Sequence, residues 1–233
     1  MSAEDKAIKK GLLNRLFAIS RSHQKKEIAE LKQKISKFIS KNADTMADDE
    51  LRDGLRILEI SEKAAKHEDF EKLCKMAEPI INRLIDLDTW NARDLEFLSV
   101  AIAYAMTVEQ AEILFINALR ELEKYEYFTK WINKIKFVLF ENFIFRLLRM
   151  EYYEVLEYTD LFNQTMKVAL KFYEENNLQL SISIALVRKG LFLDDYSFVE
   201  MGLKRIKKAG ENEIYKMMEQ EIDDYEKNRG EFI

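Results

Sequence analysis

Residues 137–150 read FVLFENFIFRLLRM, and this stretch is apolar enough to belong to a buried element. Asn142, Arg146 and Arg149 interrupt it at spacings of four and three residues. At 3.6 residues per turn, this spacing places the three polar side chains on one narrow stripe of a helix. The stripe is either the edge of a core helix, exposed or bonded internally to a neighbouring hairpin, or the polar wall of a binding groove.

The rest of the chain follows the same helical period. There are one proline and six glycines in 233 residues, and apolar residues recur at spacings of three and four, so we predict an all-α chain. Thr107 opens a capping box with Gln110 three residues later, and Gly190 and Gly210 each follow a cationic turn that is typical of a helix end. The expected helices cover residues 4–20, 23–41, 47–66, 68–86, 91–105, 108–124, 127–150, 152–175, 178–189, 195–209 and 211–228.

The links between these helices are very short, which favours antiparallel neighbours. Helix pairs recur at intervals of roughly 35–50 residues, which is typical of stacked helical hairpins. We therefore expect residues 1–233 to form a single domain, a right-handed solenoid of antiparallel helical hairpins with degenerate tetratricopeptide-like repeats. Such stacking buries a continuous core and leaves a concave surface. Gly202 lies within the helix expected at 195–209, where close packing needs a small residue.

The net charge of −5 hides an asymmetry, because residues 1–42 hold eleven basic and four acidic side chains. The lysines of this segment fall between Leu31, Ile35 and Phe38, so they form the solvated face of an amphipathic helix rather than a nucleic-acid arm. The acidic remainder should repel DNA. We expect no direct contact between this chain and nucleic acid.

The single cysteine, Cys74, excludes an internal disulfide and is expected to be a buried apolar residue. No run of about 18 apolar residues lacks charge, and the first residues contain no apolar signal core. These features predict a cytoplasmic protein without a membrane-spanning segment.

Catalytic signatures are missing from the sequence. His23 and His67 both lie in polar segments, and there is no metalloprotease motif, paired CxxC or glycine-rich phosphate loop. We therefore expect no enzyme, no metal and no cofactor. Beyond the stripe, Tyr104 and Arg188 are weaker candidates for a binding groove, because a core ring and a helix C-cap are the simpler interpretations of these two residues.

Three segments carry a resemblance to a known family. They read EPIINRLIDLDTWNARDLEFLSVAIAYAM at 78–106, FVLFENFIFRLLRMEYYEVLEY at 137–158 and VRKGLFLDDYSFVEMGLKRIKKAGENEIYKMMEQEIDDYEK at 187–227. Their order resembles the C-terminal repeat domain of the Rgg/GadR/MutR family of transcriptional regulators, with Trp90 and Asn142 at matching positions. The family's N-terminal helix-turn-helix domain is expected to be absent, because residues 1–20 already look like the first repeat helix.

This resemblance implies transcription regulation through quorum sensing. In the family, the repeat domain forms a homodimer and binds a short signalling peptide in its concave groove. Asn142, Arg146, Arg149, Tyr104 and Arg188 are then the candidate groove residues. Asparagine can both donate and accept, and arginine can hold a carbonyl or carboxylate in a fixed fork, which suits an extended peptide. The alternative function is a stand-alone adaptor or scaffold that binds a regulator or another protein without binding DNA.

Overall fold

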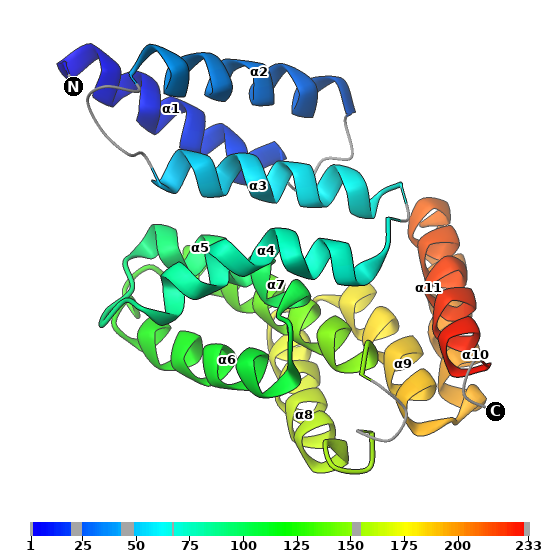
Figure 1. Ribbon diagram of the computed structural model, residues 1–233. Coiled ribbons are helices and arrows are strands. Elements are labelled where there is room, and N and C mark those ends of the chain that lie inside the picture. The colour runs from blue at the N-terminus through cyan, green and yellow to red at the C-terminus, as the bar shows by residue number, and fades with distance from the viewer. Residues whose placement is uncertain (1, 20–24, 43–48, 67, 151–154, 231–233) are drawn as a thin grey trace. The chain divides into compact units, whose positions relative to one another are not determined.

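The computed structural model describes residues 2–19, 25–42, 49–66, 68–150 and 155–230. Within these ranges every regular element is helical, which confirms the all-α prediction (Figure 1). The α-helices are α1 (Ala3–Ile19), α2 (Lys25–Lys41), α3 (Asp49–Ala64), α4 (Phe70–Ile85), α5 (Ala92–Ala101), α6 (Val108–Glu123), α7 (Thr129–Leu148), α8 (Thr159–Glu175), α9 (Gln179–Leu193), α10 (Tyr196–Lys208) and α11 (Asn212–Gly230), and one 3₁₀ helix, η1 (Ile102–Tyr104), follows α5. His23 and His67 lie outside the described residues.

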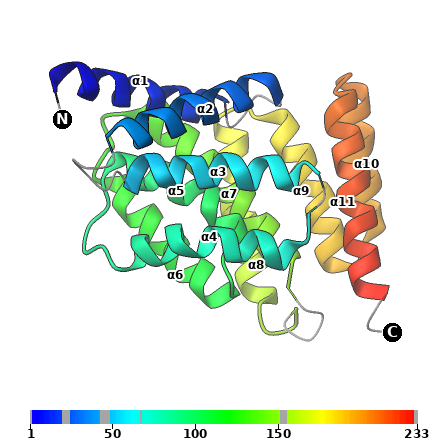
Figure 2. The same ribbon diagram turned by 45° about the horizontal axis from the view of Figure 1, so that its top comes forward.

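The chain divides into two compact units, and the boundary falls inside α7. Unit 1 covers Met1–Ile135 and unit 2 covers Lys136–Ile233. Within each unit, helices that follow one another in sequence pack together, as α3 does with α4 and α9 with α10 (Figures 1 and 2). None of the described helices is both long enough and apolar enough to cross a bilayer.

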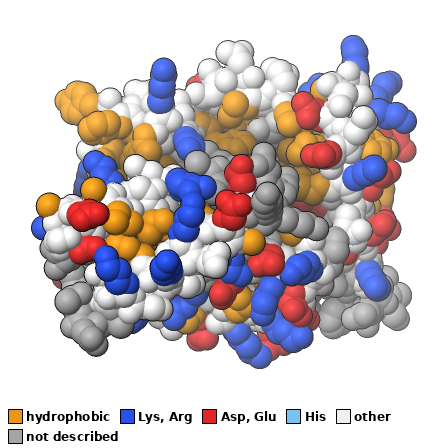
Figure 3. All heavy atoms as spheres, turned by 90° about the horizontal axis from the view of Figure 1, so that it is seen from above, with side chains coloured by type: hydrophobic (Ala, Val, Ile, Leu, Met, Phe, Trp, Pro, Cys, Tyr) orange, Lys and Arg blue, Asp and Glu red, His pale blue; other side chains and the backbone are white. Residues whose placement is uncertain are grey.

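The amphipathic start of the chain has the predicted polarity. Leu31, Ile35 and Phe38 are buried on one side of α2. Lysines of α1 and α2 form ion pairs with acids of the same unit: Lys9 with Glu50 at 2.7 Å, Lys32 with Glu62 at 2.8 Å and Lys41 with Asp5 at 3.7 Å. Acidic and basic side chains are intermixed over the face drawn in Figure 3. The basic segment is therefore partly neutralised within its own unit.

The middle of unit 1 is organised by side-chain caps and a tied-down loop. Thr107 caps α6 by accepting a hydrogen bond from the Gln110 amide, as its sequence predicts, and Asn91 opens α5 with a complete capping box. Before α5, the Trp90 indole Nε1 donates to the Leu84 carbonyl at 2.7 Å, which fixes the loop against the end of α4. Cys74 is buried, as expected, and is not in a disulfide.

An arginine ties three helices of unit 1 together. Arg83 of α4 donates through Nε to Asp53 of α3 at 2.6 Å and through Nη1 to Asp94 of α5 at 3.0 Å. Burial raises the pKa of Asp53, and the hydrogen bond and charge of Arg83 oppose this rise. Buried carboxylates need such partners, so this cluster fixes α4 between α3 and α5.

Two glycines set the packing of α9 against α10 in unit 2. A Cβ on Gly202 would lie 2.5 Å from the Ser183 carbonyl oxygen, and one on Gly190 would lie 2.7 Å from the Val199 amide nitrogen. The prediction that the helix ends before Gly190 was wrong, because α9 continues to Leu193 and ends at Asp194 in the left-handed conformation. Gly190 is thus a contact residue inside the helix. The backbones of α9 and α10 approach closely at both glycines.

Candidate functional site

The most unusual side chain of unit 2 is Arg188, which is buried near the middle of α9. Its Nη1 donates to Glu141 of α7 twice, to the carboxylate Oε2 at 2.7 Å and to the backbone carbonyl at 3.1 Å. Its Nε and Nη2 donate to the two carboxylate oxygens of Glu221 of α11, at 2.7 Å and 3.0 Å. One guanidinium group therefore joins three helices, and it binds Glu221 in the paired geometry that arginine favours for carboxylates.

A second arginine lies beside the first. Arg149, just after the end of α7, is half-buried and forms an ion pair with Asp224 of α11 at 3.5 Å. The guanidinium carbons of Arg149 and Arg188 lie 5.2 Å and 5.9 Å from the centre of the Phe145 ring. Both distances are within the range of a cation–π interaction. Arg149, Arg188 and Phe145 are called the arginine cluster below.

Burial makes the electrostatics of this cluster unusual. It raises the pKa of the Glu141 carboxyl, and the positive charge of Arg188 opposes the rise. Burial lowers the pKa of Arg188, but the charges of Glu221 and Glu141 more than offset this and leave it raised. The pKa of Tyr173 is raised by burial and by the nearby charge of Glu141.

This arrangement is suited to binding carboxylates and backbone carbonyls. Arg188 binds both the backbone carbonyl and the carboxylate of Glu141, and it also binds the carboxylate of Glu221 on α11. A buried guanidinium keeps its charge and its N–H donors need acceptors, so a group that leaves must be replaced by another acceptor. The cluster is therefore selective for acidic or carbonyl-bearing partners.

The predicted groove residues are divided between the two units. Asn142 and Arg146 both lie on α7 in unit 2, where Asn142 is half-buried and Arg146 is buried. Arg149 and Arg188 are brought together at Phe145, as described above. Tyr104 belongs to η1 of unit 1, where its ring centre lies 6.1 Å from that of Phe70. For Arg149 and Arg188, polar contacts between helices are what the structure records, and a role in a groove stays a prediction.

The acidic residues that contact the arginine cluster were not predicted from the sequence. Glu141 stands alone as an acid within the apolar run 137–150, and that isolation was a usable signal. Glu221 and Asp224 lie on a helix rich in acidic residues, where nothing in the sequence distinguishes them. Tyr173 resembles the many other aromatic residues of the core. The missing signal is the pairing of residues that lie far apart in the chain.

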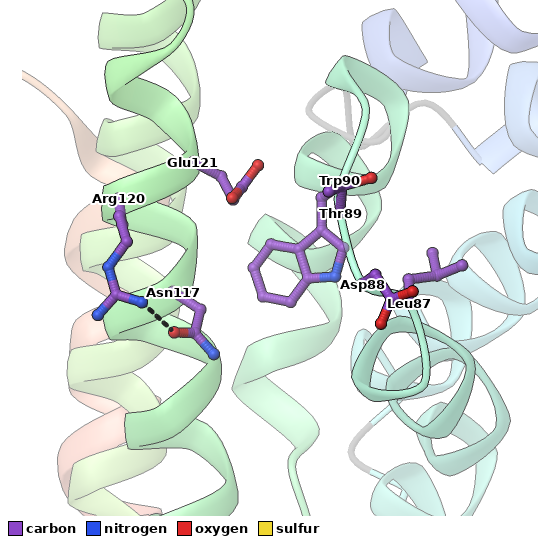
Figure 4. A pocket seen from close by; sticks show the side chains of 7 residues that line it. All are labelled: Leu87, Asp88, Thr89, Trp90, Asn117, Arg120 and Glu121. Atoms are coloured by element: carbon purple, nitrogen blue, oxygen red, sulfur yellow. Dashed lines mark hydrogen bonds between the residues drawn. The ribbon is translucent and has the colours of Figure 1, made fainter.

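Unit 1 offers a second, more open site. A pocket of about 240 Å³ lies between the loop before α5 and the side of α6, and Figure 4 shows its lining residues: Leu87, Asp88, Thr89, Trp90, Asn117, Arg120 and Glu121. Within it, Arg120 donates to the side-chain oxygen of Asn117 at 3.3 Å. The indole N–H of Trp90 is occupied by the Leu84 carbonyl. The charged and polar side chains of the pocket are exposed (Asp88, Thr89 and Arg120) or half-buried (Asn117 and Glu121), so none is as buried as Arg188.

Among the described residues, no group of three or more histidine, cysteine or acidic side chains is placed to hold a metal ion. The chain matches no protein-family model, no curated protein and no solved structure.

Proposed function

We propose that this chain is the ligand-sensing and dimerisation domain of an Rgg-like transcriptional regulator, acting in the cytoplasm as a homodimer. In this proposal the helices form a right-handed solenoid of antiparallel, tetratricopeptide-like hairpins. A short signalling peptide binds in the concave groove. The chain itself binds rather than catalyses, and it makes no direct contact with DNA.

The observation that supports this proposal is the arginine cluster of unit 2. An extended peptide carries backbone carbonyls and a terminal carboxylate that must be satisfied when they are buried. Arg188 already satisfies a backbone carbonyl and two carboxylates in a largely apolar setting. Asn142 and Arg146 lie on the same helix as Glu141 and Phe145, so in this proposal they add polar groups to the site along α7.

The proposed work of the domain is to convert peptide binding into a shift between dimer states. A ligand can shift such an equilibrium only by its unequal affinity for the two states. The peptide must therefore make contacts in one state that are missing in the other.

The test is a titration of the chain with short peptides encoded beside its gene. A bound peptide at a hundred times its dissociation constant should stabilise the fold by about 2.7 kcal/mol, measured by thermal unfolding. Asn142→Ala and Arg146→Ala should weaken binding, whereas Arg205→Ala, an exposed arginine of α10, is the matched control. Equal affinity of the parent and both α7 variants would remove the stripe from the site.

A second candidate function is an adaptor or scaffold that binds a protein partner. It is favoured by apolar side chains left exposed in unit 1: Ile113 and Ile116, one turn apart on α6, are 59% and 46% exposed. Tyr127 and Phe128, which follow α6, are 88% and 64% exposed. A pull-down with the parent and with Ile113→Lys/Ile116→Lys distinguishes the two functions. Loss of a partner in the variant, with peptide binding unchanged, supports the adaptor.

A further inference from the structure

Helix α11 differs from the other helices of unit 2 in how it is attached. Among its described side chains, Met218 alone is buried, whereas α9 buries ten residues. Yet α11 supplies both carboxylates, Glu221 and Asp224, that face the arginine cluster. It packs beside α10 and against α9 (Figures 1 and 2). Its attachment therefore depends on ion pairs more than on apolar burial.

We propose that α11 is a displaceable occupant of the arginine cluster, and that the ligand of this site is an amphipathic peptide with two carboxylates about one helical turn apart. The peptide takes the positions of Glu221 and Asp224 when α11 leaves. This inference rests on the proposed function in one respect, because it names the chemistry of the peptide that the same site would sense.

The spacing of the two acids defines the ligand. Glu221 and Asp224 are three residues apart, so they project from the same face of α11. Arg188 binds Glu221 through two hydrogen bonds, and Arg149 lies 3.5 Å from Asp224, with Phe145 near both cations. The two arginines therefore bind two carboxylates that are a fixed distance apart. A peptide with one carboxylate satisfies only half of this surface.

The burial of Arg188 makes the event an exchange rather than a simple opening. The side chains of Arg188 and Glu221 are 8% and 11% exposed. If α11 left alone, Arg188 would keep Glu141, but its Nε and Nη2 would lose their acceptors, and buried donors without acceptors are unfavourable. A carboxylate from the ligand removes that penalty. The state in which α11 occupies the arginine cluster is thus stable without ligand, and a ligand of matching charge can displace α11.

Two further contacts of α11 are compatible with release. The Tyr196 hydroxyl donates to Glu226 at 2.6 Å, and the Lys207 ammonium lies 5.8 Å from the centre of the Tyr215 ring; both contacts are near the surface. Gly210, just before α11, has a φ of +77°, and a Cβ built there would meet nothing within 4 Å. A glycine can change its backbone angles more freely than other residues, so it provides a hinge.

The experiment uses the full chain and a fluorescent synthetic peptide with the sequence of residues 212–230. In the chain, Glu221→Gln/Asp224→Asn weakens the internal competitor and leaves both arginines in place. Because apparent affinity scales with the fraction of sites that are open, this variant should bind the probe about tenfold more tightly than the parent. Hydrogen exchange over residues 212–227 should also rise in the variant. The control is Glu213→Gln/Asp223→Asn, which removes two acids from exposed positions of α11.

Two further arms keep the test decisive. A probe that itself carries Glu221→Gln/Asp224→Asn should bind every chain more weakly than the charged probe does, because it lacks both anions. If the double variant of the chain fails to fold, Asp224→Asn alone, at the more exposed of the two pairs, should give a smaller gain in affinity of the same sign. Equal affinity of the parent and the folded variant, or equal binding of the charged and neutral probes, overturns the proposal.

The two proposals fail in different ways. Exchange of the α11 probe without binding of any short peptide encoded nearby supports the displaceable helix and argues against peptide sensing. Binding of such a peptide with no change in the exchange of α11 supports sensing and overturns displacement.

Discussion

The two units of this chain use the same device in different surroundings. In unit 1, Arg83 holds Asp53 and Asp94 from the two helices beside it. In unit 2, Arg188 holds Glu141 and Glu221, again from two other helices. Each arginine neutralises two carboxylates that are largely buried. The chemistry of the two clusters is therefore nearly the same.

The difference lies in the helices that carry the acids. Helices α3 and α5 bury six residues each, so neither can leave Arg83 without exposing a large part of the core. Helix α11 buries Met218 alone among its described side chains. An ion cluster is therefore a permanent or a reversible contact according to how many apolar residues its helices bury, because this burial sets the free-energy cost of opening.

The largest expected effect comes from removing each arginine. Arg83→Leu leaves Asp94 and, apart from its contact with Arg56, Asp53 buried without a cation, and it should lower the free energy of unfolding by about 3–5 kcal/mol. Arg188→Leu should cost less, because α11 can detach and return Glu221 to water, and of the two carboxylates only Glu141 then stays inside the unit without its cation. Urea denaturation measures both losses.

Hydrogen exchange should show where each unit opens. In Arg83→Leu, we expect α3, α4 and α5 to lose protection together. In Arg188→Leu, α11 should lose protection while α9 keeps it. A variant of Arg188 in which α9 and α11 exchange at the same rate would contradict the proposed difference between the units.

A smaller effect is expected from filling the space at a glycine in each unit. At Gly202 the atoms met by a new Cβ include backbone of α9, so Gly202→Ala should force the helices apart and cost about 1–3 kcal/mol. At Gly54 the close atom, 2.8 Å away, is a methyl carbon of Leu16, which can move. Gly54→Ala should be close to neutral, since alanine also favours the helix. Thermal unfolding of both variants checks this order.

Much of the helical layout could be predicted from periodicity and caps. The helix expected at 108–124 is α6, because the Thr107 cap fixes its start. A predicted helix boundary is wrong where a glycine is needed for close packing and does not end the helix, as at Gly190 inside α9. The 3₁₀ turn at Ile102–Tyr104 was also merged into the helix expected at 91–105, since apolar spacing does not distinguish the two helix types over three residues.

Only the basic residues of the candidate site could be predicted from the sequence. The cations Arg146 and Arg149 stand out because they interrupt an apolar run, and Arg188 because it precedes a glycine. Their anions do not, because acids at helical spacing are common in a chain with 34% charged residues. The pair Arg188–Glu221 spans 33 residues and two turns of the chain, so only the packing of α9 against α11 reveals it.

The pH dependence of stability should report the burial of Glu141. A carboxyl group whose pKa is raised by folding takes up a proton in the folded state first, so it adds stability as the pH falls through the raised pKa toward its ordinary value near 4.5. The stability of the parent relative to Glu141→Gln should therefore grow as the pH is lowered from neutral toward 4.5, by about 1.4 kcal/mol for each unit of pKa shift. Chemical denaturation at several pH values measures it, and a difference that shrinks on acidification would contradict this.

Among the ion pairs, the smallest effect should come from Asp224→Asn. The Arg149–Asp224 pair is the more exposed contact of α11, with side chains 19% and 33% exposed, so its loss should cost at most about 1 kcal/mol. Salt screens exposed charges more than buried ones, so 1 M NaCl should remove most of the difference between this variant and the parent. The loss caused by Glu221→Gln should persist at the same salt concentration, because Arg188 is buried. If the Arg149–Asp224 pair is sensitive to salt and the Arg188–Glu221 pair is not, a charged ligand should replace Asp224 first and Glu221 second. If both losses respond equally to salt, the two arginines act as one exposed surface and the stepwise exchange fails.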